Sequence, residues 1–178
     1  MQVDLSPLKR KNFQGSLPFE GTWQPEPDVF KNEGLLFDQP VQLRGRLWKE
    51  RDCLQAEIEL SARGRMRCDR CNNWYAYRPD MTYEARYCPD ESEADSESSL
   101  DEGVYYGRWN PKENQLDLLP GIIEQLILSL PTKKLCRDDC QGLCPSCGTN
   151  LNEDRCQCER QSVDPRLAEL SQWLRRSE

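Results

Sequence analysis

The chain has 178 residues, a net charge of −7 and no histidine; 37% of its residues are hydrophobic and 31% are charged. This length suggests one domain, with room for a small appendage. The absence of histidine excludes Ser-His-Asp catalysis, histidine-ligated zinc enzymes and histidine pH switches built from this chain alone. The sequence contains no run of about 18 apolar residues and no signal-peptide pattern at its start, so we expect a cytoplasmic protein, or a stromal one in a plastid, without a membrane span.

The clearest β-strand signal is a hairpin over residues 41–48 and 57–66, in which apolar and polar residues alternate. We expect a register that pairs Leu43 with Leu60, because one face of the hairpin is then apolar. The same register places opposite charges across from each other on the other face. These charged pairs are Arg44 with Glu59 and Arg46 with Glu57.

Three arginines, Arg63, Arg65 and Arg67, fall on one face of the extended second strand. A row of this kind is typical of contacts to RNA phosphates or to a partner protein. The alternative is a solvated sheet face, on which the neighbouring arginines are neutralised by glutamates. The sequence leaves both interpretations open.

Further elements follow along the chain. We expect strands at 73–78, 82–88 and 104–109, and a disordered acidic loop over 89–102, where residues 90–102 hold seven acids and no base. An apolar stripe with helical spacing then predicts a long helix over 119–130, ended by Pro131. A terminal helix is expected at about 165–176.

Eight of the ten cysteines form close pairs, which in a reducing compartment favour metal over disulfides. The strongest signal is Cys144-Pro145-Ser146-Cys147-Gly148, a tight knuckle that the turn-forming residues after it connect to Cys156 and Cys158. These four cysteines are predicted to form one zinc site. A second site would take Cys68, Cys71, Cys136 and Cys140.

Other arrangements of the cysteine pairs remain open. Cys68 and Cys71 can instead join Cys144 and Cys147 in a ribbon-like set, some pairs can be plain thiols, and four cysteines can also bind an iron–sulfur cluster. Cys53 and Cys88 have no evident partner. The expected cofactor is one or two structural zinc ions.

The order of these features resembles the YceD family, the large ribosomal RNA subunit accumulation proteins. The resemblance rests on Cys68-Asp69-Arg70-Cys71, the acidic loop, Leu116-Asp117-Leu118 opening a helix, the run from Leu135 through Asn152, and Asp164-Pro165-Arg166-Leu167-Ala168-Glu169-Leu170. It implies a role in the synthesis, processing or stability of 23S ribosomal RNA, and it carries over no catalytic residue. The implied partners are a ribosomal precursor, 23S rRNA, or a processing or assembly protein, with no membrane and no small-molecule substrate.

Together these observations predict an α+β fold, with a small, mostly antiparallel β-sheet packed by one long helix, a C-terminal Cys-rich zinc knuckle and a terminal helix. The expected domains are 1–134, including the acidic loop, and 135–178. The predicted function is a non-enzymatic ribosome-biogenesis factor that acts through a zinc-ordered docking surface. The alternative is a thiol redox or metal electron-transfer protein.

Overall fold

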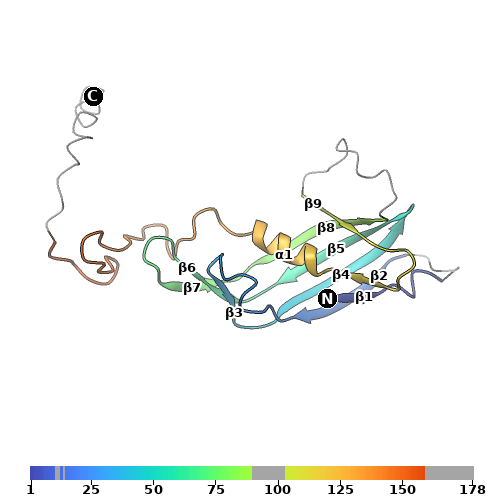
Figure 1. Cartoon of the computed structure of the whole chain (residues 1–178), viewed down its shortest axis with the longest axis horizontal. Helices are drawn as coiled ribbons and strands as arrows, with labels where there is room; N and C mark the ends of the chain where they lie inside the picture. The colour runs from blue at the N-terminus through green and yellow to red at the C-terminus, as the bar shows by residue number, and fades with distance from the viewer. Residues whose placement is uncertain (11–12, 14, 90–102, 159–178) are drawn as a thin grey trace, which may run out of the picture. The chain divides into compact units, whose positions relative to one another are not determined.

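The computed structural model describes residues 1–10, 13, 15–89 and 103–158. These residues contain ten β-strands and one α-helix (Figure 1). The chain forms two compact units. One combines Met1–Asp69 with Asn73–Cys136, and the other combines Arg70–Asn72 with the chain from Arg137 onward.

The largest element of the first unit is a five-stranded sheet in the order β2-β4-β5-β8-β9. The predicted hairpin register is confirmed, because Leu43 pairs with Leu60 and Arg44 with Glu59. The sheet is antiparallel except at its edge, where β9 runs parallel to β8. Its strands are β2 (Leu17–Trp23), β4 (Val41–Glu50), β5 (Cys53–Ser61), β8 (Asp80–Cys88) and β9 (Val104–Arg108).

The second hairpin strand is not continuous, which corrects the single extended strand expected over 57–66. β5 ends at Ser61, and β6 (Gly64–Arg67) belongs to a separate three-stranded sheet in the order β3-β6-β7, with β3 at Leu35–Phe37 and β7 at Trp74–Tyr77. At the break, the Ala62 N–H donates to Pro79 O and the Arg63 carbonyl accepts from the Asp38 N–H. These bonds satisfy backbone groups where the chain leaves one sheet for the other.

A two-stranded sheet completes the described strands. β1 (Gln2–Asp4) pairs antiparallel with β10 (Gln115–Asp117), so the start of the chain lies beside the segment that leads into the helix. Both strands have only three residues, too few for a clear period-2 pattern, and the sequence did not predict them.

The helix α1 spans Leu119–Leu128, ten residues, which corrects the expected long helix over 119–130. It ends at Ser129, whose hydroxyl donates to Leu126 O. Pro131 makes a further helical turn unfavourable, because a residue that precedes proline avoids the α region. Over the described residues the architecture is therefore mainly β-sheet with one short helix.

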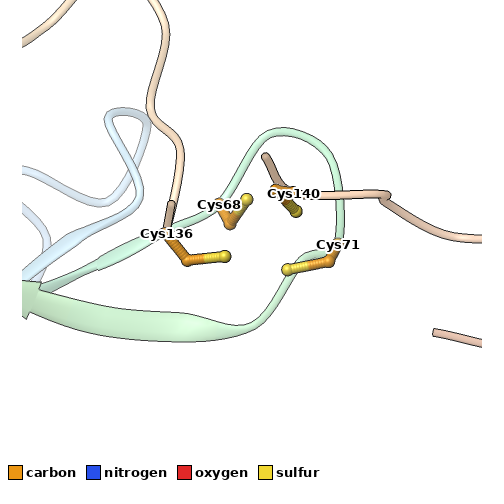
Figure 2. Close-up of side chains that lie close together, drawn as sticks. All are labelled: Cys68, Cys71, Cys136 and Cys140. Atoms are coloured by element: carbon orange, nitrogen blue, oxygen red, sulfur yellow. The ribbon is translucent and has the colours of Figure 1, made fainter. Parts of the chain in front are cut away.

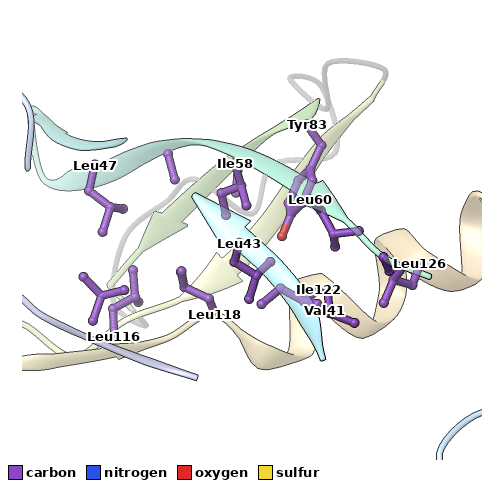
Figure 3. Close-up of a cluster of buried hydrophobic side chains, with 14 of the residues drawn as sticks. Val41, Leu43, Leu47, Ile58, Leu60, Tyr83, Leu116, Leu118, Ile122 and Leu126 are labelled. Carbon is purple, nitrogen blue, oxygen red and sulfur yellow. The ribbon is translucent and has the colours of Figure 1, made fainter. Parts of the chain in front are cut away.

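Figure 3 shows how the helix contributes to the core. Leu118, Ile122 and Leu126 face the inner side of the five-stranded sheet, where Leu43 and Ile58 meet them, and all five side chains are at most 3% exposed. Each fully buried leucine or isoleucine contributes about 1.5–3 kcal/mol relative to an exposed one. The opposite face of the sheet stays charged and open.

Cys53 and Cys88 form a disulfide, which corrects the expectation that neither has a partner. Cys53 begins β5 and Cys88 ends β8, and the pairing of Leu54 with Tyr87 brings the two cysteines opposite each other with Cα atoms 4.4 Å apart. The contact depends on how β5 and β8 pair, and sequence spacing does not show this.

The acidic run 90–102 and the terminal helix at about 165–176 lie outside the described residues. Within the described part, α1 is too short to cross a membrane.

Candidate metal centres

The first candidate centre is a small knuckle of the second unit, between Cys144 and Gly148. The Gly148 N–H donates to Cys144 O at 2.8 Å, and the Cys144 N–H donates to Thr149 O at 2.8 Å. Gly148 has φ of +73°, a left-handed conformation that glycine adopts without steric cost. A β-bridge between Leu143 and Asn150 closes the turn. The knuckle is thereby a miniature hairpin with cysteines on its tip.

Four thiols converge at this knuckle. The sulfur atoms of Cys144, Cys147, Cys156 and Cys158 all lie within 4.8 Å of one another. A tetrahedral zinc site with Zn–S bonds of about 2.3 Å has sulfur–sulfur edges of about 3.8 Å. The four sulfurs therefore need only small movements to close around one ion.

The electrostatics of the knuckle favour a bound cation. Backbone N–H groups of Cys147 and Ser146 donate to the Cys144 sulfur and lower the pKa of that thiol to about 6. The Thr149 side chain and backbone lower the pKa of Cys147 in the same way. The thiol of Cys158 lies beside Cys147 and Cys144, and its pKa is raised. A bound metal ion would supply positive charge that stabilises thiolate ligands at this site.

The second candidate centre groups Cys68, Cys71, Cys136 and Cys140, whose sulfurs also lie within 4.8 Å of one another. Figure 2 shows their side chains pointing toward a common point. Cys68 and Cys71 flank the turn between β6 and β7, and Cys136 and Cys140 follow the helix. Three of these cysteines are buried and Cys136 is half-buried. Four thiols this close, with so little solvent, can also hold a metal ion.

Local hydrogen bonds fix the chain around the second centre. The backbone N–H of Asp69 donates to Lys134 O at 2.7 Å, and the Lys134 N–H donates to the Asp69 carboxylate at 2.9 Å. This reciprocal pair holds the residues next to Cys68 against those next to Cys136. The Arg70 guanidinium donates to the carbonyl of Cys140 at 2.9 Å.

Asn152 is a supporting residue of the second centre. Its side-chain oxygen accepts from the Gln141 N–H and from the Arg137 guanidinium, both at 2.8 Å, and its amide nitrogen lies 3.4 Å from the Cys140 sulfur. Thr149 has a similar position, with its hydroxyl 3.1 Å from the Cys147 sulfur. Outer contacts of this kind orient metal ligands. Asn and Thr among closely spaced cysteines are the available sequence signal.

The arginines that the sequence placed near one another lie on two different sheets. Arg65 and Arg67 lie on β6, and Arg63 lies just before it, so all three belong with the three-stranded sheet. Arg44 and Arg46 belong to the other sheet, on β4, where they pair with Glu59 and Glu57. The expected neutralisation of Arg44 and Arg46 by glutamates is therefore confirmed, and these ion pairs lie on a different sheet from Arg65 and Arg67.

The fold and the thiol clusters define a small, mostly β protein with two four-cysteine groups that can hold metal ions. A family model described as large ribosomal RNA subunit accumulation protein YceD matches residues 56–173, so the chain belongs to the YceD family. No solved structure matches the chain.

Curated relatives match shorter stretches. A Mycobacterium tuberculosis protein named as uncharacterised is 40% identical over 62 residues, which are 35% of this chain and 30% of the relative. The Arabidopsis thaliana protein named large ribosomal RNA subunit accumulation protein YCED homolog 1, chloroplastic, is 32% identical over 54 residues, which are 30% of this chain and 17% of the relative. The chain thus spans less than a third of the length of these relatives.

Proposed function

We propose that this chain is a non-enzymatic factor that supports the synthesis, processing or stability of 23S ribosomal RNA. The observation that carries the proposal is the family match over residues 56–173. The name of the Arabidopsis relative supports the same role and adds a plastid location for that protein. For this chain we propose a cytoplasmic location, or the stroma if it comes from a plant.

The proposed mechanism is a docking surface ordered by zinc. The knuckle around Cys144 and Cys147 has almost no apolar core, since Leu143 is 41% exposed and Cys144 is its one buried hydrophobic side chain among the described residues 143–158. A structural zinc ion supplies folding free energy to segments of this kind. We propose that Cys144, Cys147, Cys156 and Cys158 hold one zinc ion, that Cys68, Cys71, Cys136 and Cys140 hold a second, and that the ordered surface binds a ribosomal precursor or an assembly protein.

The cellular experiment measures the ratio of mature 23S to 16S rRNA in cells that lack this chain. The ratio should fall and be restored by the unaltered chain. Cys147→Ser should fail to restore it, because a three-thiolate site binds zinc weakly. Ser146→Ala is the matched control in the same knuckle, since it keeps the backbone N–H that Cys144 accepts from. An unchanged ratio without the chain would contradict the proposed role.

Metal analysis tests the mechanism separately. The purified protein should contain up to two zinc ions per chain and be colourless. A coloured iron protein would contradict the zinc proposal and favour electron transfer instead. Protein prepared without chelators that contains no metal would contradict any metal-ordered surface.

A further inference from the structure

The outer face of the three-stranded sheet combines arginines with an exposed tryptophan. Along β6, Gly64 and Met66 are buried while Arg65 and Arg67 are exposed. Trp74 of β7 lies directly opposite Arg67 and is 39% exposed. The outward-facing surface of these two strands is therefore rich in positive charge and carries an exposed aromatic ring.

Two more arginines extend this face. The alternation of buried and exposed residues continues to Arg63 before β6 and to Arg78 after β7, and both are exposed. We call Arg63, Arg65, Arg67, Trp74 and Arg78 the arginine face. In the described part of the chain its one ion pair joins Arg65 to Asp38, with Nε 3.0 Å from Oδ1. Four guanidinium groups against one carboxylate leave the face positive on a protein whose net charge is −7.

Arg67 and Trp74 form a stacked pair on this face. The guanidinium carbon of Arg67 lies 5.1 Å from the centroid of the indole ring. A cation held over an aromatic ring is attracted by the negative face of the ring. The pair therefore presents two flat groups, both of which can stack on a nucleobase.

We propose that the arginine face binds single-stranded RNA, with phosphates on the arginines and a base stacked on Trp74. This inference deepens the proposed function by naming the direct ligand and the surface that binds it. Arg65 and Arg67 are two residues apart on one strand, about 6.6 Å at roughly 3.3 Å per residue, so both can reach one extended backbone. Planar guanidinium groups bind phosphate through two parallel hydrogen bonds.

The aromatic residue favours RNA over an acidic protein as the ligand. An acidic peptide would satisfy the arginines but would not use the exposed indole, whereas every unpaired base has a π-face. It also favours single strands over a duplex, whose bases are already stacked on each other. The five residues of the arginine face are all exposed, so an extended single strand can reach them.

The other sheet provides a matched control. Arg44 and Arg46 occupy alternate positions of β4, as Arg65 and Arg67 do on β6, and Arg46 lies 5.7 Å from the ring of Trp48. Both of these arginines are paired with glutamates, Arg46 with Glu57 at 2.6 Å. The two surfaces therefore share an arginine pair at alternate strand positions and a nearby tryptophan, but only the arginines of β4 are both paired with glutamates.

The binding experiment uses the full-length, metal-loaded protein and a fluorescent 12-nucleotide oligouridine, titrated at several salt concentrations. R65Q/R67Q should lower the salt slope by about 1.4, at about 0.7 per lost phosphate contact, which is about 25-fold in affinity at 0.1 M salt. W74A should weaken binding by about 5- to 150-fold. R44Q/R46Q and W48A, the matched variants, should change binding little. Circular dichroism and thermal melting check that each variant is folded.

Several outcomes would overturn the inference. These are the absence of oligouridine binding by the unaltered protein, equal losses in R65Q/R67Q and R44Q/R46Q, or oligoglutamate peptide competing as well as RNA at equal charge. If W74A does not fold, W74L takes its place, and binding unchanged by that variant would remove the stacking step. A fall in the 23S to 16S ratio on loss of the chain, together with no RNA binding in solution, would refute this inference and leave the proposed function standing.

Discussion

Removing the disulfide between Cys53 and Cys88 should destabilise the folded chain substantially. The bond links residues separated by 35 positions. In the chain-entropy model, opening a loop of this size returns about 12.7 cal/mol/K to the unfolded chain, or about 3.8 kcal/mol at 25 °C. At about 2.1 cal/mol/K of unfolding entropy per residue, this is a fall of about 10 °C in Tm for the whole chain.

The assay compares urea unfolding of the oxidised protein with that of Cys53→Ala/Cys88→Ala and of the protein reduced by a phosphine. The reduced protein keeps both sulfur atoms. The difference in unfolding free energy between the reduced protein and the variant therefore measures the packing of the two thiols. The difference between the reduced and the oxidised protein measures the contribution of the crosslink. We expect the crosslink to account for most of the loss. If reduction lowers the free energy of unfolding by less than about 1 kcal/mol, the chain-entropy account of this disulfide is wrong. The segments of β5 and β8 would then already restrict the unfolded chain to the same extent as the bond.

Two further predictions concern the core and the knuckle. Leu118→Ala, at a fully buried position, should lower the free energy of unfolding in urea by about 2–5 kcal/mol. Leu128→Ala, at a position that is 67% exposed, should change it by no more than about 0.5 kcal/mol. Similar losses in the two variants would contradict the assignment of Leu118 to the core and of Leu128 to the surface. In metal-free protein the lowered pKa of Cys144, about 6, means that its thiolate is present above that pH and lost as pH falls through it. The rate at which iodoacetamide alkylates Cys144 should therefore level off by about pH 7–8. The rate for Cys158, whose pKa is raised, should keep increasing above pH 9. Mass spectrometry measures both rates, and the same pH profile for the two cysteines would contradict this prediction.

Local patterns predicted the parts of the fold that depend on neighbouring residues. The register of Leu43 with Leu60 follows from alternation on both strands and from the charges on their outer face. The four cysteine pairs follow from spacing, and the structure brings together the same two sets of four. The register and the Cys144–Cys158 set each need only one hairpin or one loop, whereas the set of Cys68, Cys71, Cys136 and Cys140 also needs a contact between distant segments.

The features that the sequence did not predict depend on contacts between distant segments. The pairing of β1 with β10 joins residues more than 110 positions apart, and three-residue strands carry too little pattern to be recognised. The Cys53–Cys88 bond likewise needs the β5–β8 register. The break after Ser61 is another such case, because strict alternation continues through Arg67 although the strand changes sheets.

The turn between β6 and β7 carries two cysteines of the second candidate metal centre and is flanked by the stacked pair of Arg67 and Trp74. Arg67 immediately precedes Cys68, and Trp74 follows Cys71 by three residues, so the stacked pair flanks the turn that carries these two cysteines. A metal ion at the proposed second site would hold Cys68 and Cys71 together and so would also fix the spacing of Arg67 and Trp74. Thermodynamic reciprocity then requires RNA to tighten metal binding by the same factor by which metal tightens RNA binding. If both proposed sites are occupied as we propose, removal of the ion from Cys68 and Cys71 should therefore weaken RNA binding at the arginine face.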